Sequence, residues 1–210
     1  MNVKTVIDFA RAFHSSSHHG WDHVERVRKL ALRIGKEEGA DLEVLEIAAY
    51  LHDIMREEEM RLKGDFCHAE KGAERAGVFL KSMGYDKWGE VVHCIRAHRF
   101  HGGNVPETLE AKVLYDSDKL DSIGAIGIAR AYAYNGVKGS PMFAEVDEGY
   151  VPEGNARFQP EHTAVHEYVC KLSKVKDKML TGTGRRIAEE RHAFMMGFFE
   201  RLEKEVKGLI

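Results

Sequence analysis

The feature that most constrains the fold is an apolar run, residues 47–54, that ends in an adjacent histidine and aspartate, His52 and Asp53. In a helix, Val44, Ala48 and His52 recur at intervals of four residues, so His52 points the same way as the apolar stripe. Placing an ionisable pair against a core costs free energy unless something compensates, and a bound cation compensates well. A lone pair of this kind is more often a histidine capped by its neighbour, so the rest of the chain must decide.

The composition is that of an ordinary globular protein. The 210 residues are 43% hydrophobic and 31% charged, which is enough for a substantial core. A net charge of −3 gives no bulk attraction to nucleic acid or to an anionic membrane, so we expect neither as a partner. The three cysteines form no CxxC pair and indicate neither a zinc knuckle nor a disulfide framework. With no signal-peptide pattern and no membrane-spanning run, we expect a cytoplasmic protein.

The apolar periodicity predicts an all-α fold in a single domain, residues 1–210. Helices are expected at about 3–13, 23–38, 42–55, 68–83, 86–99, 107–118, 123–133, 162–180 and 184–207. We expect Asp22 and Asp41 to cap the second and third of these, and Pro106 to open the sixth. The segment 135–160 is rich in glycine and proline and lacks periodicity, which is typical of a functional loop or a disordered one; a lid is one such role.

Two more polar side chains share the inward direction of His52. His23 lies on the apolar face of the expected 23–38 helix, at its first turn, and Asp118 follows the stripe of Ala111 and Leu114. Two imidazoles and two carboxylates suit one divalent ion such as Mn²⁺, Mg²⁺, Fe²⁺, Co²⁺, Ni²⁺ or Zn²⁺. Four protein ligands leave two octahedral positions for water and a substrate oxygen, as in catalytic sites. The candidate metal ligands are His23, His52, Asp53 and Asp118.

The order of these residues and their flanks resemble the HD superfamily of metal-dependent phosphohydrolases. Residues 21–27 (WDHVERV), 51–54 (LHDI) and 111–121 (AKVLYDSDKLD) are similar to its successive motifs. Stretches 122–130 and 186–195 resemble the small stand-alone YpgQ/YedJ-type branch, so the likeness covers most of the chain. The resemblance implies an α-helical bundle that holds one divalent cation and hydrolyses a phosphate ester or a nucleotide phosphoanhydride. The branch favours a nucleoside triphosphate cleaved to monophosphate and pyrophosphate.

Three aspartates compete for the last ligand position. The match to the family motif selects Asp118, and the stripe from Ala111 and Leu114 agrees. Asp121 lies on the same stripe and is the alternative. Asp116 is expected to cap or pair at the surface.

His68 and His98 fall in the interval where some HD phosphodiesterases supply ligands for a second metal. That role is one of three. We favour a second role, in which both histidines line the pocket and contact phosphate or protonate the leaving group. In the third, His68 is a residue at a helix start and His98 is a cation at a helix C-terminus, where the helix dipole favours it. Asp53 or Glu57 could orient the attacking water, although the charge run 56–59 favours a solvated face for Glu57.

A polyphosphate substrate requires cationic groups around the metal. The candidate phosphate-binding residues are Arg26, His68, Arg99, Lys119 and Lys171. A nucleoside monophosphatase or a phosphodiesterase of the same fold is the nearest alternative. A non-catalytic nucleotide sensor is the rival from another class, and it predicts the loss of one or more ligands. Helix faces rich in small residues fit either a homodimer interface or the core, so the oligomeric state stays open.

Overall fold

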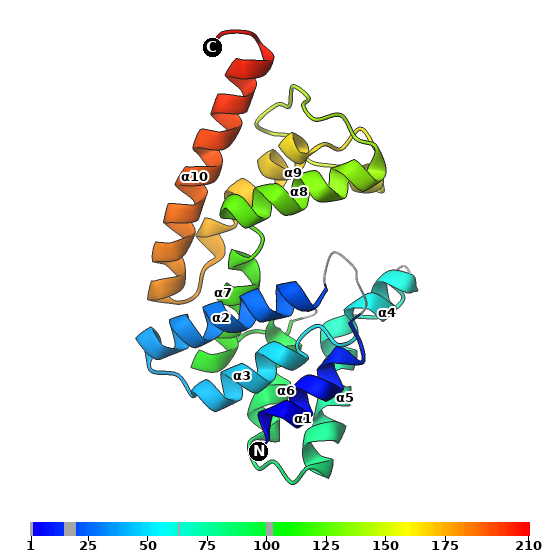
Figure 1. Ribbon diagram of the computed structural model, residues 1–210, viewed down its shortest axis with the longest axis vertical. Helices are drawn as coiled ribbons and strands as arrows, with labels where there is room; N and C mark the ends of the chain where they lie inside the picture. The colour runs from blue at the N-terminus through cyan, green and yellow to red at the C-terminus, as the bar shows by residue number, and fades with distance from the viewer. Residues whose placement is uncertain (1, 15–19, 63, 100–102) are drawn as a thin grey trace. The chain divides into compact units, whose positions relative to one another are not determined.

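A computed structural model describes residues 2–14, 20–62, 64–99 and 103–210, with the side chain of residue 157 left aside. All regular secondary structure in these ranges is helical, which confirms the all-α fold class (Figure 1). The chain divides into two compact units, one formed by Met1–Asp118 with Leu180–Gly184 and the other by Lys119–Met179 with Arg185–Ile210. That residues 1–210 form a single domain stays a prediction.

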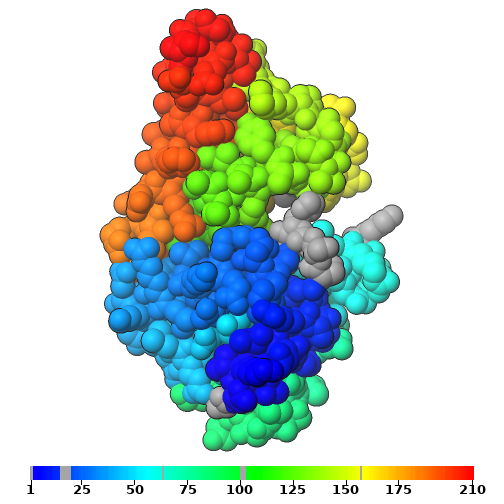
Figure 2. All heavy atoms as spheres, viewed as in Figure 1, coloured from blue at the N-terminus to red at the C-terminus, as the bar shows by residue number. Residues whose placement is uncertain are grey.

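The first unit is a bundle whose helices are α1 (Val3–Arg11), α2 (Trp21–Glu38), α3 (Leu42–Leu51), α4 (Arg56–Arg61), α5 (His68–Ser82), α6 (Trp88–Ala97) and most of α7 (Leu109–Leu120). Helix α3 lies at its centre and packs against α1, α2 and α6, while α5 packs against α6. Every α3 residue from Ile47 to Leu51 is buried, as an apolar run in a central helix should be. Figure 2 shows α1, in dark blue, on the surface of this unit.

Local chemistry sets the ends of these helices. The Asp41 carboxylate accepts the backbone N–H groups of Glu43 and Val44, so its predicted capping role is confirmed. The predicted Asp22 cap is wrong, because α2 begins at Trp21, two residues earlier than expected, with Gly20 as its N-cap. Asp22 instead lies in the first turn and pairs with Arg26 at 2.7 Å.

The expected helices 42–55 and 107–118 have other bounds in the structure. The expected 42–55 helix ends at Leu51, where His52 takes the C-cap position, and a short turn leads into α4. Helix α7 begins at Leu109, so Pro106 lies outside it and does not open the helix. The Thr108 hydroxyl accepts the N–H of Ala111 and so caps its first turn.

The second unit holds α8 (Gly124–Lys138), α9 (Ala164–Cys170), the greater part of α10 (Gly182–Val206) and the 3₁₀ turns η1 (Ala156–Phe158), η2 (Leu172–Lys174) and η3 (Lys176–Lys178). The expected 162–180 helix is therefore α9 followed by two 3₁₀ turns. Tyr168 stacks on Phe199 at 4.3 Å between ring centroids. Helix α8 starts at Gly124, whose φ of +77° is strained for any other residue, and a β-carbon there would crowd the Arg191 side chain at 3.0–3.3 Å. No helix among the described residues is long and apolar enough to cross a membrane.

Candidate metal centre

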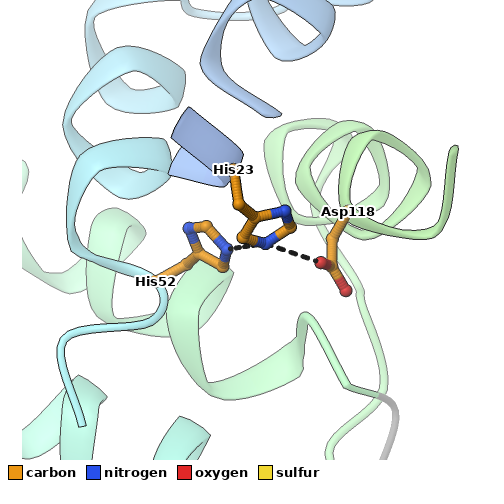
Figure 3. A group of neighbouring side chains, drawn as sticks. All are labelled: His23, His52 and Asp118. Atoms are coloured by element: carbon orange, nitrogen blue, oxygen red, sulfur yellow. Dashed lines mark hydrogen bonds and ion pairs between the residues drawn. The ribbon is translucent and has the colours of Figure 1, made fainter. Parts of the chain in front are cut away.

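The four predicted ligands meet in the first unit. His23 comes from the first turn of α2, His52 and Asp53 follow the end of α3, and Asp118 lies in the last turn of α7. His23, His52 and Asp118 point toward one another (Figure 3). Both histidines and Asp53 are buried, whereas the Asp118 side chain is 19% exposed.

The ligand atoms lie close to the spacing that a metal ion imposes. His23 Nε2 is 3.4 Å from His52 Nε2, 3.5 Å from Asp118 Oδ1 and 3.6 Å from Asp53 Oδ2. His52 Nε2 is 3.7 Å from the same Asp53 oxygen. Neighbouring ligands of an octahedral ion with bonds of about 2.1 Å lie about 3 Å apart. A small inward movement would therefore complete a coordination sphere.

The protonation of His52 favours metal binding. Its Nδ1 lies 2.8 Å from the backbone oxygen of Ala49, which can only accept, so Nδ1 carries the proton and Nε2 presents a lone pair to the group. Burial lowers the pKa of His52 from 6.5 to about 4, because the buried imidazolium loses its hydration, and this outweighs the nearby Asp53. Neutral imidazole, held from behind by a carbonyl, is the form that binds metals.

A second cluster shares Asp53 with the first. Asp53 Oδ1 lies 3.1 Å from His68 Nε2 and 3.6 Å from His98 Nε2, and these two nitrogens are 3.3 Å apart. His98 Nδ1 donates to the backbone oxygen of Ile95 at 2.6 Å, so its Nε2 also presents a lone pair unless the ring is charged. The two oxygens of Asp53 thus face different clusters, one of His23, His52 and Asp118 and one of His68 and His98, hereafter the first and second clusters.

Asp53 is held as a carboxylate. Burial alone would raise its pKa, but the facing His52, His68 and His98 outweigh burial and hold the pKa well below its usual value. Its negative charge is therefore present at neutral pH, where it can attract a cation to either cluster.

The other aspartates of the last motif have different roles. Asp116 is fully buried and accepts the N–H groups of Leu180 and Thr181 and the Thr181 hydroxyl, at 2.6–2.9 Å. The expectation that it pairs at the surface is wrong: it anchors the 180–184 segment to α7. Asp121 is buried too, and in the second unit its carboxylate pairs with Arg130 at 2.8 Å. Of the three, Asp118 is the aspartate that joins the two histidines.

The remaining predicted site residues lie apart from the two clusters or have other contacts. Glu57 is a partly exposed residue of α4, and Arg26 pairs with Asp22 along α2. Lys119 follows Asp118 on α7, and Lys171 pairs with Glu167 at 2.7 Å in the second unit. Their catalytic or phosphate-binding roles stay predictions.

One residue of the site, Glu59, is not predicted from the sequence. Glu59 belongs to the charge run 56–59, yet it is only 7% exposed and its carboxylate lies 2.8 Å from His68 Nδ1 and from Arg99 Nη1. A six-residue helix is too short for its apolar periodicity to reveal which member of such a run faces inward.

Comparison with known proteins places this site in a family. The profile of the HD domain family matches residues 20–123, which contain both clusters. YpgQ of Bacillus subtilis (strain 168) is 35% identical over 198 residues, 92% of this chain and 87% of YpgQ. Its crystal structure in complex with ADP superposes with a TM-score of 0.74 at 30% identity over the whole of both chains. An HD-superfamily hydrolase from Bacillus thuringiensis gives 0.73 at 29% identity, covering 98% of this chain and 96% of that one.

These matches and the clustered histidines and aspartates define a hydrolase with an HD domain. The chain belongs to the HD superfamily, in the branch that includes YpgQ. The resemblance of its motifs, the hydrolase class and the helical fold are confirmed. Its His and Asp groups could hold a divalent metal ion.

Proposed function

We propose that this protein is a metal-dependent phosphohydrolase that converts a nucleoside triphosphate to its monophosphate and pyrophosphate. The observation that carries the proposal is the convergence of buried imidazole nitrogens and carboxylates on one point, with His52 held neutral. Bringing such donors together without a cation leaves lone pairs and negative charges facing one another in a buried site. The ADP in the YpgQ complex supports a small nucleotide as the ligand.

In this proposal His23, His52, Asp53 and Asp118 hold one divalent ion. Such an ion lowers the pKa of a bound water and screens phosphate charge, which is the chemistry that phosphoryl hydrolysis needs. The partly exposed Asp118 marks the side from which the phosphate chain enters.

The second cluster acts on the phosphate in the same proposal. His68 and His98 lie against the other oxygen of Asp53, where they can contact a phosphate oxygen or donate a proton to the leaving group. Asp53 or Glu57 orients the attacking water. Arg26, Arg99, Lys119 and Lys171 remain the proposed cationic contacts of the polyphosphate.

The experiment that tests this function is metal analysis of the purified protein together with a screen for phosphate and pyrophosphate release from nucleotides. We expect about one metal per chain and pyrophosphate release, both lost in Asp53→Ala. Asp8→Ala is the matched control, because Asp8 is an exposed aspartate of α1 that pairs with Lys4, one helical turn away. Release of phosphate alone from monophosphates would instead identify a nucleoside monophosphatase.

One observation favours a second candidate, a two-metal phosphodiesterase. Asp53 directs Oδ1 at two histidines and Oδ2 at two others, which is how a carboxylate bridges a pair of metal ions. Two metals per chain, with cleavage of phosphodiesters, would make His68 and His98 ligands. A metal-free protein that binds nucleotides and cleaves none would leave the sensor as the function.

A further inference from the structure

The buried carboxylate of Glu59, on α4, contacts His68 of the second cluster and two arginines. Glu59 Oε2 lies 2.8 Å from His68 Nδ1, and Glu59 Oε1 lies 2.8 Å from Arg99 Nη1 and 3.3 Å from the backbone N of His68. Arg56 Nη1 also donates to Glu59 Oε2. One carboxylate thus receives donors from α4, from the start of α5 and from the residues after α6.

We propose that Glu59 is a positioning residue, which orients His68 and holds Arg56 and Arg99 as a pair of guanidinium groups that binds a phosphate of the substrate. The proposal rests on the proposed phosphohydrolase function and extends it to residues outside the stretches 21–27, 51–54 and 111–121.

The orientation of His68 follows from hydrogen-bond chemistry. Both ring nitrogens of His68 face carboxylates, which can only accept: Nδ1 lies 2.8 Å from Glu59 Oε2, and Nε2 lies 3.1 Å from Asp53 Oδ1. Glu59 therefore fixes the orientation of the ring and keeps Nε2 directed at Asp53. A carboxylate behind a histidine also raises the basicity of the ring. Burial alone would raise the pKa of Glu59, but His68, Arg56 and Arg99 outweigh burial and keep it below its usual value, so the carboxylate is ionised.

The phosphate-binding role follows from charge and exposure. Glu59 supplies one negative charge for two guanidinium groups, so the group carries one excess positive charge. Arg56 and Arg99 are fixed at one end by Glu59, yet their side chains are 25% and 34% exposed and keep donors for another anion. Their Nη1 atoms lie 3.4 Å and 3.3 Å from His68 Nδ1, so both cations lie one imidazole away from Asp53. Arginine held this way is suited to binding phosphate through two donors.

A purely structural ion-pair network is the competing explanation, and kinetics separate the two. In Glu59→Gln the side chain keeps its shape, but its amide N–H₂ faces donors and one acceptor is lost. We expect kcat/KM for the nucleotide cleaved by the wild type to fall about 10–100-fold, as for outer partners of metal-site histidines. Glu58→Gln is the matched control: Glu58 is the preceding residue of α4, exposed and paired with Arg61, and we expect a change within twofold.

Arg99→Lys tests the phosphate contact without removing a charge. We expect inorganic pyrophosphate to bind the Mn²⁺-loaded protein at least about tenfold more weakly in calorimetry, because lysine lacks the planar fork. Arg61→Lys, on the exposed face of α4, is the control and should bind pyrophosphate as the wild type does. Because Arg99 is partly exposed, this variant carries the test even if Glu59→Gln does not fold.

Either part of the proposal can fail. Unchanged kcat/KM in Glu59→Gln, or a loss that follows its melting temperature alone, would overturn the positioning role. Unchanged pyrophosphate affinity in Arg99→Lys would overturn the phosphate-binding pair. If the wild type cleaves no nucleotide but binds pyrophosphate more tightly than Arg99→Lys, the proposed function fails while this inference stands.

Discussion

Two regions of the molecule bring together side chains that can bind metals. They differ in the direction of the hydrogen bonds that their histidine rings make. The first and second clusters surround Asp53 in one unit, whereas His162, Glu167 and Cys170 form a group in the other unit. In each set the candidate ligand atoms lie within 4.8 Å of one another. Residue type and proximity therefore do not distinguish these regions.

Hydrogen bonds do distinguish them. Around Asp53, the Nδ1 atoms of His52 and His98 donate outward to backbone oxygens, which leaves the Nε2 atoms facing inward. In the second unit, His162 meets the Tyr150 hydroxyl at Nδ1 and Glu167 at Nε2, at 3.3 Å and 3.1 Å.

The two regions also differ in how the charges of their carboxylates are balanced. The other oxygen of Glu167 pairs with Lys171 at 2.7 Å, so a lysine already balances its charge. The region around Asp53 directs imidazole Nε2 atoms and carboxylates at one another, whereas His162 lies in a hydrogen-bonded network with Tyr150 and Glu167. We therefore expect metal to bind at Asp53 and not at His162.

The most severe way to break the Asp53 region is Asp53→Asn, which removes its charge and leaves its shape. Both clusters face this carboxylate, so we expect metal to be lost and activity to fall at least about 1,000-fold, since a catalytic metal supplies several kcal/mol of transition-state stabilisation. Metal analysis and product release measure the two effects, with Asp8→Asn as the surface control. Full metal content in the variant would contradict the central role of Asp53.

The stability of the metal-free protein as a function of pH gives a second test of the Asp53 region. The pKa of His52 falls from 6.5 to about 4 on folding, so the unfolded chain binds the proton more readily than the folded one. The stability this gives is fully present above pH 6.5 and is lost as the pH falls toward 4, by at most about 3 kcal/mol. The Asp53 pKa lies below this window, so its contribution is constant there.

Urea unfolding in the presence of a chelator, between pH 7 and 4.5, measures this slope. His52→Gln should make the slope less steep, with a remainder from His166 and His192, whose pKa values burial also lowers, whereas Glu58→Gln should leave the slope unchanged. An equally steep slope in His52→Gln would assign the effect to another group.

In the second unit, we expect His162→Gln to disturb folding and leave metal binding intact. His162 is buried, and removing a partner from a buried hydrogen-bonded network costs about 1–3 kcal/mol. Urea unfolding should show that loss, while the metal content of the purified protein should equal that of the wild type. A lower metal content at unchanged stability would contradict the distinction between the two regions.

The sequence predicts those site residues that follow the apolar periodicity of a helix. His23 and Asp118 lie on the apolar stripes of α2 and α7, and His52 continues the stripe of α3 as its C-cap, so their convergence follows once those helices pack. Asp116 and Glu59 escaped prediction because each is buried by partners distant in sequence. Asp116 accepts from residues 180–181, and Glu59 is enclosed by His68 and Arg99. A charge run or a polar motif shows no sign of such partners, so tertiary contacts decide burial there.

The smallest expected effect comes from Cys170→Ala. This variant tests directly whether His162, Glu167 and Cys170 form a metal site or a hydrogen-bonded network. Thiolate is a strong zinc ligand, so a metal site built on His162, Glu167 and Cys170 would lose most of its zinc affinity without the sulfur. In the second unit, the partly exposed thiol donates weakly to the backbone oxygen of Glu167, at 3.9 Å. We therefore expect unchanged zinc and manganese binding in calorimetry and a stability change within about 0.5 kcal/mol. A lost zinc-binding event would mean that the direction of hydrogen bonds does not separate the two regions, and that the second unit carries a metal site of its own.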